Sequence, residues 1–182
     1  DTAALSDLIE KEAFDYLVPG CTDRSYKSCA IVSQGRFPGI ESPDIEHGMH
    51  NKEKFRTIAE KLNLPITETQ NHNSKSLDYP VIIKPVDSFS GRGITVINNR
   101  NKKLFDSAIE LARKNSATEE YLLEKFVSGE LYSHSAFLKN KRAIKNFFVK
   151  EDSTVNSFVV DTSRVIFTPP PEMQRQIINA VE

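Results

Sequence analysis

The residues best suited to chemistry are a lysine and a glycine-rich loop near the middle of the chain. Lys84 ends a short apolar run and precedes Pro85, and segment 88–93 reads Ser-Phe-Ser-Gly-Arg-Gly. Glycine allows positive φ angles and a close approach of the backbone to a ligand, and successive N–H groups of such a loop form a concave anion site. With the charges of Lys84 and Arg92, the pattern predicts a phosphate site. The alternative is a solvated hairpin with a polar tip.

Two β-branched runs, residues 81–83 and 94–97, flank this loop. They are too short for helices and predict two strands joined as a hairpin. The loop is not a Walker A loop, because that motif opens a helix and here a strand follows. Its arrangement is nearer to the flap of protein kinases, which covers phosphates between two antiparallel strands.

Three segments, taken in order, resemble the ATP-grasp superfamily. They are Tyr-Pro-Val-Ile-Ile-Lys-Pro at 79–85, Ser-Gly-Arg-Gly-Ile at 90–94 and Leu-Leu-Glu-Lys-Phe-Val-Ser-Gly-Glu at 122–130. The pattern is most similar to the group that contains the large chain of carbamoyl-phosphate synthase, biotin carboxylase and phosphoribosylglycinamide synthetase. Several motifs in the family's order are more specific than any one of them.

The resemblance implies a nucleotide-binding role for each matching residue. Two lysines, Lys52 and Lys84, would hold the phosphates of ATP. The residues that would cover these phosphates are Ser88, Ser90, Gly91, Arg92 and Gly93. Lys52 starts a helix, where the helix dipole does not favour a cation, although a solvated lysine is the alternative there.

The segment from Glu124 to Val127 would meet the adenine ring. The C=O of Lys125 would accept a hydrogen bond from adenine N6, and the N–H of Val127 would donate one to N1. Glu130 would accept hydrogen bonds from the ribose hydroxyls, and its alternative is an acid in a surface turn. No catalytic residue is assigned.

The activity implied by the resemblance is the ligation of a carboxylate or bicarbonate to an amine or ammonia, through an acyl phosphate made with ATP. In the relatives, two later strands carry the carboxylates and the asparagine that hold Mg²⁺. This chain has no Glu-x-Asn-x-Arg pattern, so we expect no metal ligands in it and expect Mg²⁺ only in a complete parent protein. A nucleotide-binding module without turnover and a structural fragment are the alternatives.

The composition favours an ordinary globular protein. Lys plus Arg number 24 and Asp plus Glu 25, and no apolar run could cross a bilayer. We therefore expect a cytoplasmic protein with no nucleic-acid or membrane partner, and self-association is left open. The first residue is Asp1 rather than Met, so we expect a processed chain or a piece of a longer one.

The fold class expected is α/β, of the ATP-grasp type. Residues 1–50 would form part of a leading lobe, 51–123 a connecting helix and the small lobe, and 124–182 an incomplete second lobe. Helices are expected at 5–14, 25–33, 51–62, 102–115 and after 171; strands are expected at 14–19, 66–69, 81–83, 94–97, 121–127, 131–138, 143–150 and 156–167. Residues 34–48 are expected to be a loop, and His47 and His50 at its end invite a metal site or a loop contact.

Overall fold

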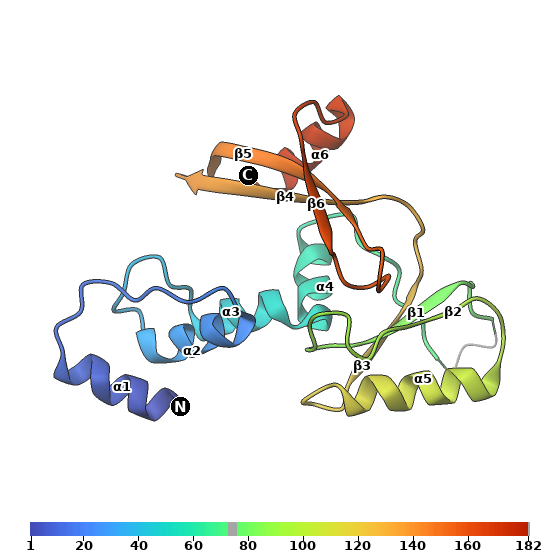
Figure 1. Ribbon diagram of the computed structural model, residues 1–182, viewed down its shortest axis with the longest axis horizontal. Coiled ribbons are helices and arrows are strands. Elements are labelled where there is room, and N and C mark those ends of the chain that lie inside the picture. Colours follow the sequence, from blue (N-terminus) through green and yellow to red (C-terminus); the bar gives the residue numbers. More distant parts are fainter. Residues whose placement is uncertain (73–75, 182) are drawn as a thin grey trace. The chain divides into compact units, whose positions relative to one another are not determined.

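The computed structural model describes residues 1–72 and 76–181, which fold as two compact units, Asp1–Ile66 and Thr67–Glu182. Helices and antiparallel strands both occur, which confirms the α/β class (Figure 1). None of the described helices is long and apolar enough to span a bilayer. The three-part division expected from the sequence stays a prediction.

The first unit contains four helices among its described residues: α1 (Thr2–Lys11), α2 (Asp23–Ser33), α3 (Pro43–His50) and α4 (Lys52–Lys61). Side chains cap each N-terminus. Asp1, Thr22, Ser42 and Asn51 accept hydrogen bonds from the first free N–H groups of the four helices in turn. Ile9, Val32 and Phe37 form a small core.

Two expectations for this unit are wrong. Residues 14–19 form no strand, and Tyr16 and Val18 are 71% and 82% exposed. Their aromatic and β-branched types suit a strand, but among the described residues no other strand pairs with them, and a strand forms only against a partner. Residues 34–48 are not all loop, because α3 begins at Pro43. Ser42 as N-cap and proline at N1 favour a helix start at this position, and the sequence-based prediction missed them.

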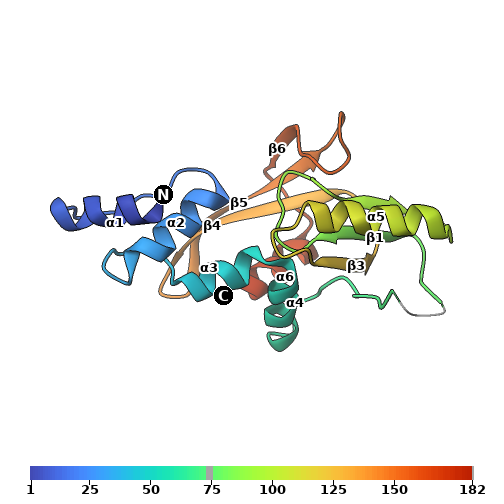
Figure 2. The same cartoon turned by 90° about the horizontal axis from the view of Figure 1, so that it is seen from below.

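Sheet A of the second unit carries the predicted hairpin. Its strands are β1 (Val81–Pro85), β2 (Thr95–Ile97) and β3 (Tyr121–Lys125), all antiparallel, in the order β2-β1-β3. Helix α5 (Lys102–Lys114) runs along one face (Figure 2). Its alanines pack on apolar side chains of all three strands; the buried members of this core are Val81, Ile83, Ile97, Ala108, Ala112 and Leu123.

Sheet B contains β4 (Leu131–Lys139), β5 (Arg142–Asp152) and β6 (Thr162–Ile166), antiparallel in that order, and α6 (Pro171–Val181) follows. The strand expected at 156–167 is therefore shorter than predicted, because residues 153–161 form a loop. At 66–69 only a single bridge forms, between Thr69 and Glu124.

Candidate functional site

Lys84 and Glu124 lie together on the face of sheet A opposite α5. Side chains alternate between the faces of a strand, so Ile83 and Leu123 point to α5 while Lys84 and Glu124 point away. The two side chains form an ion pair, with Lys84 14% exposed and Glu124 fully buried. A buried carboxylate needs such a partner, because an unpaired charge in the interior is costly. The lysine predicted to meet phosphate is thus held in place by a carboxylate from the neighbouring strand.

The flap, residues 88–93, is ordered by its own contacts. The Ser88 hydroxyl donates to the carbonyl of Arg92 at 2.9 Å. The Arg92 guanidinium lies 5.4 Å from the centre of the Phe89 ring, a cation–π geometry. Ser90, Gly91 and Gly93 have φ of 57°, 67° and 75°, so the backbone turns through the left-handed region that glycine tolerates best.

Both flap glycines approach other parts of the protein closely. A Cβ atom on Gly93 would lie 2.8 Å from Asn115 Cβ and 2.8 Å from Pro85 Cγ. A Cβ atom on Gly91 would lie 2.8 Å from the carbonyl oxygen of Phe158, in the loop between β5 and β6. The sequence predicted a close approach at these glycines but assigned it to a ligand.

The segment after β3 presents its backbone at an edge. The N–H of Lys125 donates to Glu68 O at 3.1 Å, and the N–H of Phe126 donates to Pro80 O at 2.8 Å on the opposite side. In an antiparallel strand the N–H and C=O of one residue point to the same side, so the C=O of Lys125 points to the side of Glu68. Val127 is 68% exposed. The contact of these two backbone groups with adenine stays a prediction.

The side chain of Lys125 has a separate role. It forms an ion pair with Asp78, and the hydrogen bond that its ammonium group donates to the Asp78 carboxylate raises the pKa of Lys125. Only the backbone of Lys125 was predicted to contact the nucleotide, and this pairing leaves that carbonyl unaffected.

Glu130 is held by two neighbours. Lys150 forms an ion pair with its carboxylate and Tyr132 donates its hydroxyl to it, and the Lys150 contact followed by the Tyr132 contact lowers the pKa of Glu130. The carboxylate is still 58% exposed. A carboxylate has about four acceptor positions, so further hydrogen bonds to a ligand are compatible with both contacts.

Sequence reasoning missed Lys150 and Arg164. They are directly paired in the β5–β6 register and form ion pairs with Glu130 and Asp152. Only the strand register, with Lys150 opposite Tyr132, brings Lys150 to the Glu130 carboxylate. Lys52 begins α4 in the first unit, and its role stays a prediction.

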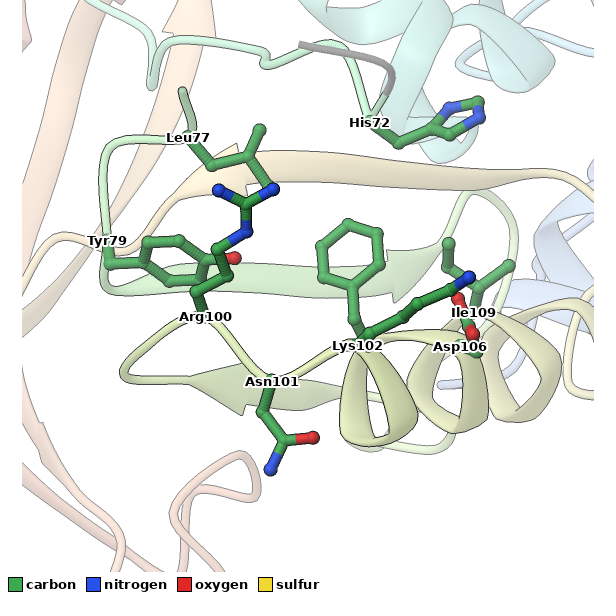
Figure 3. Close-up of a pocket in the computed structure, with 9 residues that line it drawn as sticks. His72, Leu77, Tyr79, Arg100, Asn101, Lys102, Asp106 and Ile109 are labelled. Atoms are coloured by element: carbon green, nitrogen blue, oxygen red, sulfur yellow. The ribbon is translucent and has the colours of Figure 1, made fainter. Parts of the chain in front are cut away.

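A pocket of about 270 Å³ lies at the start of α5 (Figure 3). In this view the side chain of Arg100 points toward Leu77. The described residues that line it are His72, Leu77, Tyr79, Arg100, Asn101, Lys102, Phe105, Asp106 and Ile109. Leu77, Tyr79, Phe105 and Ile109 pack against the α5-facing core, so this pocket opens on the other side of sheet A from Lys84. No residue predicted to bind the nucleotide lines it.

A comparison with models of protein families identifies the family of this chain. Residues 77–182, more than half of the 182 residues, match the family model described as ATP-grasp domain. The chain belongs to the ATP-grasp family. This confirms the resemblance found from the three motifs, and the matched range contains Lys84, the flap and Glu130.

Curated ATP-grasp relatives are longer than this chain. The chain is 29% identical over 138 residues to a formate-dependent phosphoribosylglycinamide formyltransferase of Histophilus somni (strain 129Pt), covering 70% of this chain and 35% of that protein. It is 24% identical over 143 residues to the carbamoyl phosphate synthase arginine-specific large chain of Bacillus subtilis (strain 168), covering 69% of this chain and 14% of that protein. The chain thus spans about a third or less of the length of these relatives.

Solved ATP-grasp-like structures share the fold. An L-amino acid ligase from Bacillus licheniformis superimposes with a TM-score of 0.74 at 17% identity, over 100% of this chain and 45% of that chain. The biotin carboxylase domain of Hydrogenobacter thermophilus 2-oxoglutarate carboxylase was solved with MgADP, ADP and bicarbonate. It superimposes with a TM-score of 0.74 at 16% identity, over 99% of this chain and 44% of that chain. At these identities the likeness establishes the fold.

Proposed function

We propose that this chain is the nucleotide-gripping part of a cytoplasmic ATP-grasp ligase that activates a carboxylate or bicarbonate for attack by an amine or ammonia. The observation that supports the proposal is the position of Lys84. Its ammonium group lies on the face of sheet A opposite α5 and is fixed by the buried carboxylate of Glu124. The glycine-rich flap follows the same strand. A fixed cation on the strand that leads into a loop rich in N–H groups is suited to a triphosphate.

Each remaining part of a nucleotide has a candidate partner in the second unit. The C=O of Lys125 and the N–H of Val127 match the donor and acceptor of the adenine edge. The Glu130 carboxylate accepts from ribose hydroxyls in addition to its contacts with Lys150 and Tyr132. The flap amides and Lys84 meet the phosphates, and the closed flap excludes water from the reactive intermediate.

The reaction is written as two displacements. A carboxylate oxygen of the substrate attacks the γ-phosphorus of ATP, the bond to the β,γ-bridging oxygen breaks, and ADP leaves. The amine then attacks the carbon of the acyl phosphate, phosphate leaves and the amine loses a proton. Mg²⁺ is expected in such chemistry, but the described residues contain no group of three His, Cys, Asp or Glu that could hold a metal ion. The described residues therefore do not fit the role of Mg²⁺ ligands, and no step is assigned to the metal.

A second candidate is a nucleotide-binding or structural module without turnover. The observation in its favour is that the polar side chains of the site already have protein partners. Lys84 has Glu124, Glu130 has Lys150, and Arg164 has Asp152. Such ion pairs also occur as purely structural features, where they add little or no net stability.

Trapping the acyl phosphate distinguishes the two candidates. The complete protein that contains this chain is incubated with ATP, Mg²⁺, hydroxylamine and a panel of small carboxylates. Hydroxylamine converts an acyl phosphate into a hydroxamate, so the ligase predicts hydroxamate and ADP in equal amounts with at least one acid. ATP binding without ADP formation, with every acid of the panel, would favour the module.

A further inference from the structure

The pocket at the start of α5 has a wall of apolar and aromatic side chains. Leu77 and Tyr79 come from the segment before β1, and Phe105 and Ile109 come from α5. All four pack against the buried core of sheet A, and all four are only half-buried. An apolar surface that lines a concave site is the usual contact surface for the body of a small ligand.

Two cations at this pocket have no partner in the protein. Arg100 and Lys102 both line the pocket and are exposed. Within the described part of the chain, neither forms a hydrogen bond, an ion pair or a ring contact, whereas Lys84 and Lys150 each pair with a carboxylate. Asp106 is the one acid among the described residues that line the pocket. The lining therefore carries a net positive charge that a bound anion would neutralise.

Side chains, rather than the end of α5, would hold such an anion. Asn101 points away from the other side chains of the pocket (Figure 3), and it accepts a hydrogen bond from the N–H of Leu104 at 3.1 Å. The cap thus occupies part of the helix end. The Arg100 guanidinium can donate two parallel hydrogen bonds to a carboxylate or phosphate, and the Lys102 ammonium adds a second positive charge.

The size of the pocket limits the ligand. A cavity of about 150 Å³ holds one benzene molecule, and drug-sized ligands occupy about 300–1,000 Å³. At about 270 Å³, this pocket has room for one ring with a head group. We propose that it binds a small organic anion, a single apolar ring that carries one carboxylate or phosphate group. The ring contacts the apolar wall, and the head group contacts Arg100 and Lys102.

Saturation-transfer NMR on the complete protein that contains this chain measures the binding of two probes, phenylacetate and phenyl phosphate. Two reference compounds each lack one half of the proposed ligand: benzyl alcohol has the ring without the charge, and acetate has the charge without the ring. We expect at least one probe to bind in the millimolar range or tighter, and both reference compounds to bind at least about tenfold more weakly. Binding of one probe alone would identify the head group. Benzyl alcohol binding as tightly as the probes would contradict an anion site.

Substitutions in the pocket locate the binding. Arg100→Ala should weaken probe binding by at least about tenfold, and Lys102→Ala by about threefold. The matched controls are Arg142→Ala, in the β4–β5 hairpin, and Lys103→Ala, because neither residue is part of the pocket lining. All four side chains are exposed, so these variants should fold normally. The absence of probe binding, or probe binding that Arg100→Ala leaves unchanged, would overturn the proposal.

This pocket and the proposed nucleotide site can be tested separately. The pocket opens on the other side of sheet A from Lys84, so the double variant Lys84→Met with Glu124→Gln should bind the probes like the natural protein. Loss of ATP binding in that variant with unchanged probe binding would support both sites. Failure of ATP binding in the natural protein would overturn only the proposed function, because the probe titrations need no nucleotide.

Discussion

Lys84 and Glu124 form an ion pair on the face of sheet A that is turned away from α5. The antiparallel register sets Lys84 opposite Leu122 and Glu124 opposite Ile82, so the two charged residues are diagonal neighbours on adjacent strands. A cation on β1 is thereby fixed by a carboxylate on β3, the strand that continues into the proposed adenine segment. The pair links the segments proposed to bind the phosphates and the base.

Removing only one partner of the Lys84–Glu124 ion pair should destabilise the protein more than removing both. Lys84→Met removes the ammonium group that pairs with the buried Glu124 carboxylate, and we expect the free energy of unfolding to fall by about 3–5 kcal/mol. The double variant Lys84→Met with Glu124→Gln removes both charges and should recover most of this loss. Urea denaturation of the two single variants and the double variant measures it. Additive losses in the double variant would show that the pair is not coupled.

Gly93 should tolerate a side chain less well than a glycine in open space. Its added Cβ would meet Asn115 and the Pro85 ring at 2.8 Å, and its positive φ adds strain of about 1–2 kcal/mol for an L-residue. Gly35→Ala has the strain without the contact. Thermal unfolding should therefore give a lower Tm for Gly93→Ala than for Gly35→Ala, and equal values would argue against tight packing below the flap.

The Asp161 carboxyl group should titrate at a lower pH than an ordinary aspartate. Hydrogen bonds, first that of the Thr154 hydroxyl, lower the pKa of Asp161 from 3.8 to about 2. A depressed carboxyl pKa means that its stabilising contribution is complete above the ordinary value and is lost as the pH falls through the lowered one. NMR titration of the carboxyl carbon should thus give a midpoint near 2, with residues 153–161 still protected at pH 4. A midpoint near 3.8 would mean that these hydrogen bonds do not form.

Lys52 is the second lysine predicted to contact the phosphates of ATP. If it contacts phosphate, Lys52→Ala should weaken the binding of ATP by about tenfold and leave the binding of adenosine unchanged. Lys61→Ala, at the other end of α4, is the control. Equal losses of affinity for ATP and for adenosine, or no loss for either, would remove Lys52 from the site.

Local patterns predicted the central hairpin, α5 and the β4–β5 pair because each is encoded within a short segment. The prediction at 14–19 failed because a strand depends on a partner that lies elsewhere in the chain. The length of β6 was wrong because Asp161 folds the preceding loop through contacts with Thr154 and Val155. Lys150 was missed for a similar reason, since only the strand register brings it to Glu130. The positions of functional side chains therefore depended on pairing more than on sequence spacing.

The most direct test of the account is titration calorimetry with ATP and with adenosine on the natural protein and on the double variant Lys84→Met with Glu124→Gln. The double variant removes the cation without leaving a buried charge, so a change in binding is not a folding defect. We predict that ATP affinity falls by at least about tenfold while adenosine affinity changes much less. Equal affinity of both proteins for ATP would contradict a phosphate-binding role for Lys84 and with it the proposed site.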